Sequence, residues 1–350
     1  MAISTAHIGW FADMGLVDRP TVGGKGASLG ELTRAGIPVP EGFVVRTAAF
    51  DDFIARLELE APLRAAVEAL DADDLAGITR ASEALRARVE ADELPADLRR
   101  ELVGACAELC GAEGRFPLAV RSSATTEDAE DASFAGLQDT YLWVLGADEV
   151  LRQLRACWAS LYSVPSIVYR RKKGLPEAGV SMAVVVQRMV DARSAGVMFT
   201  RSPTSGDRSV IVIEAAWGLG SAVVSGEVTP DRFVIGKVAG EISVRDIRDK
   251  HVMHVPLPGG GTHEVETPAD RREVPCVSDG ELGALREMGR RIERHYGRPQ
   301  DIEWAIDQER RLRILQSRPE TVWSIREAVP VAEVRQNPLL HVMNIFGGRQ

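Results

Sequence analysis

The chain has 350 residues and a formal net charge of −9, with 45% hydrophobic and 27% charged residues. These values are typical of a globular protein with room for two domains or one large two-lobed domain. The acidic balance argues against a nucleic-acid scaffold, and the apolar runs are too short for a transmembrane helix. No basic region precedes an apolar stretch at the N-terminus, so we expect no signal peptide.

The cysteines favour a reduced, cytoplasmic protein without a disulfide framework. Two of the four, Cys106 and Cys110, lie at helical spacing in an amphipathic run. We expect them to be small buried thiols rather than a metal-binding pair.

A glycine-rich segment surrounds Lys25 near the N-terminus. Gly23, Gly24 and Gly26 flank this residue, which is one of only five lysines in a chain that otherwise uses arginine. A helix over residues 27–35 is predicted to follow. The segment is not a Walker A motif, because the required order of glycines and lysine is absent. Two interpretations stay open: a turn that presents the lysine to an anion, and a tight structural turn with a solvated lysine.

Two regions are predicted to be helical. Residues 47–112 are rich in Ala, Leu, Arg and Glu, with apolar positions three and four apart, which predicts three or four helices. Nothing in these helices indicates catalytic residues. Residues 148–172 read as one further helix with Trp158 facing inward. Its basic end, residues 170–173, is interpreted as a solvated helix end, with contact to a partner or phosphate as the alternative.

Between these regions, a short apolar run ends at Arg121 and opens into a loop rich in Ser, Thr, Asp and Gly. A guanidinium can grip phosphate oxygens with two donors, and loop N–H groups can add neutral donors. Gly136 lets the backbone approach a ligand closely. The alternatives are a triphosphate-binding loop and a solvated surface loop.

From Ser181 the pattern changes to short strands separated by glycine-rich turns, which predicts an antiparallel or mixed sheet. Gln187 is polar within an apolar strand and needs a partner, either an adenine edge or a backbone group. Further on, His263 follows a glycine run in a polar segment. We interpret that segment as a variable hairpin and do not assign His263 to catalysis.

Residues 301–306 alternate with period two and are predicted to form a hairpin with the strand after residue 310. A symmetric turn would place Glu303 opposite Ile314, with Gln316 as its diagonal neighbour. We expect Leu312, Ile314, Gln316 and Arg318 to share one face. A carboxylate, an amide oxygen and a guanidinium would then converge, as a site for Mg²⁺ and nucleotide phosphates requires. The alternative is a surface hairpin with its charges facing water.

Taken together, these motifs resemble the N-terminal nucleotide-binding domain of the phosphoenolpyruvate synthase, pyruvate phosphate dikinase and rifampin phosphotransferase family. The resemblance runs from about Val22 to about Thr321. It rests on VGGKGASLGEL, IPVPEGFVV, VRSSATTEDAEDASFAGLQDTYL, SAGVMFTRSP, WGLGSAVVSGEVTPD, DIEWAI and ILQSRP.

The resemblance implies an α+β, two-lobed ATP-grasp-like fold that closes on ATP. We expect an N-terminal lobe over residues 1–180, a second lobe over 181–324 and a tail over 325–350. It also implies these roles: Lys25, Arg121 and Arg318 as the catalytic, phosphate-binding residues; Gly136 and Thr140 in the loop over the phosphates; Gln187 near the adenine; Glu303 and Gln316 as Mg²⁺ ligands.

Two positions depart from the family pattern: Gly26 stands in place of the usual Asn, and Ser221 in place of the usual Glu. Relatives continue into a phosphohistidine domain with a Gly-rich T-x-H motif, and we do not find that Gly-rich motif here. We therefore expect a phosphotransferase subunit that passes phosphate from ATP to a histidine on a separate subunit and releases AMP. A nucleotide-binding regulatory module and a self-sufficient small-molecule kinase are the alternatives. The apolar tail around residues 329–346 would dock on a partner or pack back on its own domain.

Overall fold

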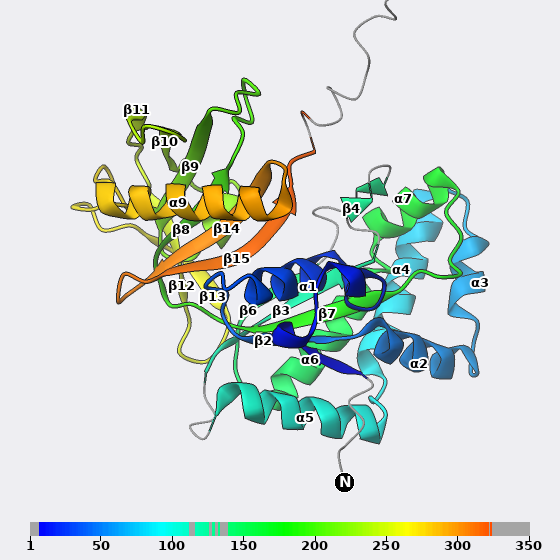
Figure 1. Cartoon of the computed structure of the whole chain (residues 1–350). Coiled ribbons are helices and arrows are strands. Elements are labelled where there is room, and N and C mark those ends of the chain that lie inside the picture. Colours follow the sequence, from blue (N-terminus) through cyan, green and yellow to red (C-terminus); the bar gives the residue numbers. More distant parts are fainter. Residues whose placement is uncertain are drawn as a thin grey trace, which may run out of the picture.

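The computed structural model describes residues 7–111, 116–125, 128–129, 132–133, 139–321 and 323, which form two antiparallel sheets and their helices (Figure 1). The first sheet has the order β1 (Ile8–Trp10), β2 (Gly42–Val45), β7 (Met182–Arg188), β3 (Leu118–Ala124), β6 (Thr140–Val144). The second has the order β11 (Ile242–Asp246), β10 (Asp231–Gly236), β9 (Val210–Trp217), β8 (Ala192–Phe199), β14 (Gln300–Asp307), β15 (Leu312–Pro319). Two separate hairpins are β4 (Asp128–Ala129) with β5 (Ala132–Ser133), and β12 (Val252–Pro256) with β13 (Thr262–Glu266).

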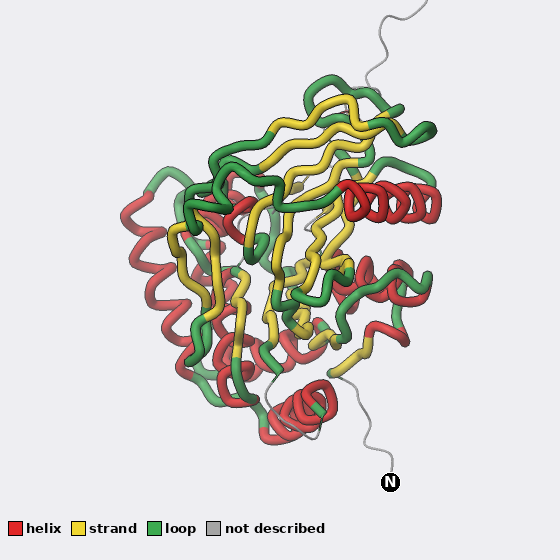
Figure 2. The backbone as a smooth tube through the Cα atoms, turned by 90° about the vertical axis from the view of Figure 1, so that its left-hand side faces the viewer, coloured by secondary structure: helices red, strands yellow, loops and turns green. Residues whose placement is uncertain are grey.

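Helices lie to the left, below and to the right of the strands, whereas loops border the uppermost strands (Figure 2). The α-helices are α1 (Arg19–Arg34), α2 (Thr47–Glu58), α3 (Leu63–Glu68), α4 (Leu75–Ala91), α5 (Ala96–Cys110), α6 (Ala147–Ser160), α7 (Val164–Lys173), α8 (Ser221–Val224) and α9 (Asp279–Tyr296). Two short 3₁₀ helices, η1 (Phe11–Asp13) and η2 (Leu16–Asp18), precede α1. The predicted α+β class with two lobes is confirmed.

The first sheet is buried on both faces. On β7, Val184 and Val186 join the core formed with the helices α2 to α7, whereas Ala183 and Val185 pack with α1 on the other face. A strand buried on both sides needs apolar residues at every position, which explains the unbroken run MAVVV.

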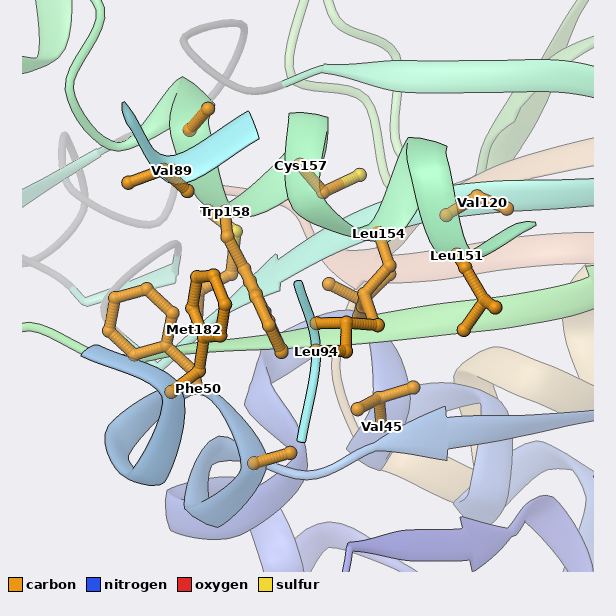
Figure 3. Close-up of a cluster of buried hydrophobic side chains, with 14 of the residues drawn as sticks. Val45, Phe50, Val89, Leu94, Val120, Leu151, Leu154, Cys157, Trp158 and Met182 are labelled. Carbon is orange, nitrogen blue, oxygen red and sulfur yellow. The ribbon is translucent and has the colours of Figure 1, made fainter. Parts of the chain in front are cut away.

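The core beneath this sheet is centred on Trp158 (Figure 3). Its ring is fully buried, and the ring centroid lies 5.8 Å from that of Phe50 and 5.1 Å from that of Phe53. The single helix expected over residues 148–172 is wrong, because α6 ends at Ser160 and α7 starts at Val164. Pro165 lies in the first turn of α7, where its missing N–H costs no helical hydrogen bond, so it marks a helix start.

The second sheet packs α9 against one face only. Ser278 starts this helix with a capping box: its hydroxyl accepts from the Glu281 N–H, and the Glu281 carboxylate accepts from the Ser278 N–H. Leu282, Leu285 and Ile292 of α9 then pack on the sheet. The opposite face carries small apolar residues such as Ala195 and Ala305 together with the polar side chains that line a cavity.

Strand β7 belongs to a different sheet from the one its position in the sequence suggests. The expected boundary at residue 180 puts β7 with the later strands, but β7 pairs with β2 and β3. The chain therefore changes sheets between Arg188 and Ala192. Sheet membership depends on partners about 60 to 140 positions away, which the local pattern of β7 does not show.

All four cysteines are free and buried, as expected for small apolar side chains. Burial raises the pKa of the Cys106 thiol to about 12, which keeps it protonated. Among the described helices, none is long and apolar enough to cross a bilayer.

Candidate functional site

A cavity of about 670 Å³ lies between the two sheets and is lined by residues of both. It opens on the face of the first sheet that also carries α1, and on the face of the second sheet opposite α9. Seven residues proposed from the sequence line it: Lys25, Arg121, Thr140, Gln187, Glu303, Gln316 and Arg318. The eighth, Gly136, lies outside the described residues.

Lys25 is held at the cavity by a kink in α1. Gly23 adopts φ 70° and ψ 178°, and a Cβ there would lie 2.0 Å from the Ser123 carbonyl oxygen. Only glycine permits both the conformation and this close approach. The Gly26 N–H then donates to Ser123 Oγ at 3.1 Å, and Lys25 Nζ donates to the Ser122 carbonyl at 3.0 Å. The glycine segment thus fastens the start of the helix to β3 and carries the lysine with it.

Arg121 joins the two sheets across the cavity. Its Nη2 donates to Glu303 Oε2 at 3.0 Å and to Gln316 Oε1 at 2.6 Å, and its Nη1 donates to the Leu315 carbonyl at 3.1 Å. The Arg121 side chain is only 10% exposed, so this charge is desolvated and needs its carboxylate partner. Residues 182 positions apart are therefore bound to one another, and Arg121 itself is not solvated. Most of the loop that follows it lies outside the described residues, so both interpretations of that loop stay open.

The register of the β14–β15 hairpin differs from the prediction. Trp304 pairs with Ile314, but Glu303 pairs directly with Gln316, because a β-bulge places Leu315 as an extra residue between them. A bulge shifts the pairing by one residue and changes which face the following side chains occupy.

The bulge also overturns the expectation that four residues of β15 share one face. Ile314 packs with Trp304 in the core beneath α9, and Leu312 packs there too. Gln316 faces the cavity with Glu303, and Arg318 does so as the partner of Asp301. Leu312 and Ile314, whose apolar side chains favoured a buried site, therefore lie on the face covered by α9. Glu303 and Gln316 share the cavity face because of the bulge.

Asp301 is a cavity residue that the sequence reasoning did not single out. Its carboxylate lies 3.5 Å from Arg318 Nε, and burial raises its pKa to about 6, with Arg318 acting in the opposite direction. Among the described residues its Oδ1 is buried without a hydrogen-bond partner. Period-two alternation could have identified it, because Asp301 and Glu303 are two positions apart and must share a face.

Gln187 and Thr140 line other parts of the cavity wall. Gln187 is 2% exposed, and its Nε2 donates to the Pro40 carbonyl at 3.2 Å, so the backbone-partner interpretation describes this structure. Thr140 pairs with Arg121 across β6 and β3. The adenine contact of Gln187 and the phosphate-loop role of Thr140 stay predictions.

The oxygen atoms of the hairpin fit the requirements of Mg²⁺. Glu303 offers a carboxylate and Gln316 an amide oxygen, which are hard ligands, and the Glu303 side chain keeps 31% exposure toward the cavity. In addition, Arg121 Nε is buried without a hydrogen-bond partner among the described residues. An unpaired polar atom beside these ligands is consistent with a polar group that binds here.

Two other sequence features lie away from this cavity. His263 is exposed on β13 and does not line it. The basic run at the end of α7 was expected to be solvated, but its first residue, Arg170, is only 1% exposed. Arg170 donates to Glu177 at 2.8 Å and to the Leu161 carbonyl. A buried arginine requires such a partner, and that partner lies in the loop after the helix.

Comparisons with known proteins show which family and which relatives this chain is similar to. The family described as pyruvate phosphate dikinase, AMP/ATP-binding domain, matches residues 19–338. A probable phosphoenolpyruvate synthase of Methanothermobacter thermautotrophicus is 43% identical, over 95% of this chain and 48% of that protein. The phosphoenolpyruvate synthase of Pyrococcus furiosus is 38% identical over 94% of the chain and 45% of its own length. A rifampicin phosphotransferase of a Streptomyces species is 43% identical over 86% and 34%.

The chain spans about half or less of the length of these relatives. The family match confirms the expected nucleotide-binding domain type. Among solved structures, D-alanyl-alanine synthetase A from Vibrio cholerae aligns at 12% identity over 69% of this chain and 54% of that chain, with a TM-score of 0.26. That score supports no statement about the fold.

Proposed function

The chain belongs to the AMP/ATP-binding domain family of pyruvate phosphate dikinase, and on that premise we propose that it binds Mg²⁺-ATP between its two sheets for phosphotransfer. The observation that carries the proposal is the convergence of Arg121, Glu303 and Gln316 in the cavity that Lys25 also lines. Two cations beside a carboxylate and an amide match the charges of a metal-bound polyphosphate.

We assign a role to each of the predicted site residues that line the cavity. Lys25, Arg121 and Arg318 bind the phosphates, since all three are cations on the cavity wall. Glu303 and Gln316 would hold Mg²⁺, which would neutralise phosphate charge. Arg121, through its hydrogen bonds, keeps both ligands aimed at one point. Gln187 lies where it can reach the adenine from β7.

The two lobes are residues 1–180 and 181–324, with β7 reaching back into the first sheet. They close on the nucleotide from opposite sides, since β3 and β6 of one sheet and β14 and β15 of the other face the same cavity. Such enclosure excludes water and strengthens the electrostatic contacts made to the phosphates.

We propose that the acceptor is a histidine carried by a separate subunit, with AMP as the leaving product. The P–O bond between the α- and β-phosphates breaks, a P–N bond forms between the β-phosphorus and an imidazole nitrogen, and the ring proton passes to solvent. His263 is not this acceptor, because it does not line the cavity. The final acceptor is recognised by that other subunit.

Nucleotide products test this function. The purified chain is incubated with Mg²⁺ and ATP, with and without a separately expressed candidate phosphohistidine protein, and the nucleotides are separated by ion-exchange chromatography. AMP formed only with the second protein supports the proposal. Binding without any product supports a regulatory module, and ADP formed with a small acceptor alone supports a self-sufficient kinase.

A matched pair of variants tests the metal role. Glu303→Ala should abolish Mg²⁺-dependent turnover while the fold stays intact. Glu309→Ala is the control, because Glu309 lies in the turn of the same hairpin, is exposed and accepts a hydrogen bond from Arg311. Turnover of Glu303→Ala equal to that of Glu309→Ala would remove Glu303 from the metal site.

A further inference from the structure

A second group of potential metal ligands lies outside the nucleotide cavity. Glu227, His254 and Glu264 each present one ligand atom, and these atoms all lie within 4.8 Å of one another. His254 is on β12 and Glu264 on β13, and these two strands form the separate hairpin labelled in Figure 1. Glu227 follows α8. None of the three lines the nucleotide cavity.

The backbone fixes two of these ligands side by side. His254 and Glu264 are direct partners in the antiparallel register, so their side chains leave the same face of the hairpin. The third lies beside them: Glu227 Oε2 is 2.6 Å from His254 Nε2. Both glutamates are exposed, and the histidine is 15% exposed, so an ion in solution can reach all three.

His254 is also oriented from behind. Its Nδ1 lies 2.7 Å from Ser221 Oγ, a hydrogen bond that holds the ring with Nε2 toward the two carboxylates. The Gly218 and Leu219 backbone bridges to His254 hold the main chain of the same residue. A ligating histidine is normally fixed in this way, through a hydrogen bond to its other ring nitrogen.

We propose that Glu227, His254 and Glu264 bind a divalent ion of the zinc class, with Ser221 as the positioning residue. One imidazole nitrogen and two carboxylate oxygens form the mixed set that Zn²⁺ accepts, with water in the fourth position. Magnesium prefers oxygen ligands alone, so this site differs in chemistry from the one at Glu303. The inference does not depend on the proposed phosphotransfer.

The distances require only small side-chain rotations. Donor atoms at ~2.0–2.1 Å from a tetrahedral zinc ion lie roughly 3.4 Å apart. Rotation of the exposed glutamate side chains shortens the distances of up to 4.8 Å and lengthens the 2.6 Å between Glu227 Oε2 and His254 Nε2, while His254 stays in place.

The ion would join two parts of the second lobe. Glu227 follows α8, and Ser221 and Val224 of that helix line the nucleotide cavity. The hairpin that carries the other two ligands reaches the first lobe, where the Gly261 N–H donates to the Trp143 carbonyl at 2.9 Å. A metal here therefore fastens one wall of the cavity to an element that contacts both lobes.

Direct metal titration tests the proposal on the full chain after treatment with a chelator. Zn²⁺ is titrated in competition with a fluorescent zinc indicator, and Co²⁺ is added separately to record its visible absorption. We expect one ion per chain and a tetrahedral-type Co²⁺ spectrum. His254→Ala should weaken binding by about 100-fold or more, and Ser221→Ala by about tenfold.

His263→Ala is the matched control. His263 is the exposed neighbour of Glu264 on β13 and faces the other side of the strand, so its loss should leave affinity unchanged. Glu264→Gln keeps the side-chain shape and should lose affinity even if His254→Ala misfolds. Equal zinc affinity of Glu264→Gln and the wild type, or equal loss in His263→Ala and His254→Ala, would overturn the site.

Discussion

The two sheets of this protein differ in what lies on their second face. In the first sheet, both faces carry helices, and polar residues such as Arg121, Thr140 and Gln187 stand where the cavity lies. In the second, α9 covers one face, and the other carries Glu303, Gln316 and Asp301 toward the cavity. The first sheet is therefore mainly a packed support that contributes Arg121, with Lys25 from α1, and the second contributes the carboxylates that line the cavity.

The largest effect should come from removing the centre of the first-sheet core. Trp158→Ala deletes a fully buried ring between Phe50 and Phe53 and should lower the free energy of unfolding by ~3–5 kcal/mol. Urea unfolding followed by circular dichroism measures it. Because Trp158 does not line the cavity, the folded fraction should bind nucleotide as the wild type does. A loss below 1 kcal/mol would mean that this core is not a packed support.

The next effect tests the link between the sheets. Arg121→Ala removes the donor to Glu303 and Gln316 and should cost ~2–4 kcal/mol of transition-state stabilisation, measured as the change in kcat/KM for ATP. Arg121→Lys keeps the positive charge but lacks the planar guanidinium with its several donors, so this variant should lose less than Arg121→Ala. Wild-type kinetics in Arg121→Ala would reject the role.

The third prediction concerns the pH dependence that Asp301 imposes on stability. Its folded pKa, raised from 3.8 to about 6 by burial, means that the folded state binds the proton more tightly than the unfolded state. Stability is therefore lost as pH rises from about 4 to about 6, by roughly 2–3 kcal/mol.

Asp301→Asn tests this sign directly. The variant should be more stable than the wild type at pH 7 and equal to it near pH 4, as measured by urea unfolding across that range. Taking the difference between the two proteins cancels the other carboxylates that titrate there. A constant difference at all pH values would contradict the raised pKa.

The smallest effect should come from the contact of α1 with the second sheet. Ser28 Oγ donates to the Ser317 carbonyl at 2.6 Å, and the serine is buried. Ser28→Ala leaves that carbonyl without this donor and should cost ~1 kcal/mol of stability. Thermal unfolding can resolve it, with Thr21→Ala as the control on an exposed hydroxyl of the same helix. Equal melting temperatures of the two variants would show that this contact does not join the lobes.

Much of the molecule could be predicted from its sequence. The apolar runs predicted β3, β7, β8, β9 and β10, and the helical region before Arg121 is α2 to α5. The glycine segment, the strand ending at Arg121 and the hairpin identified five residues that line one cavity: Lys25, Arg121, Glu303, Gln316 and Arg318. Such features are local, because periodicity and glycine placement reflect the backbone and burial of the segment itself.

Other features were decided only by contacts between distant residues. Strand β7 joined the first sheet, Arg170 became buried against Glu177, and the bulge at Leu315 brought Gln316 opposite Glu303. The burial that raises the pKa of Asp301 likewise comes from the packed sheet. Register, sheet membership and desolvation depend on which segments pack together, and a single sequence read along its length does not contain those pairings.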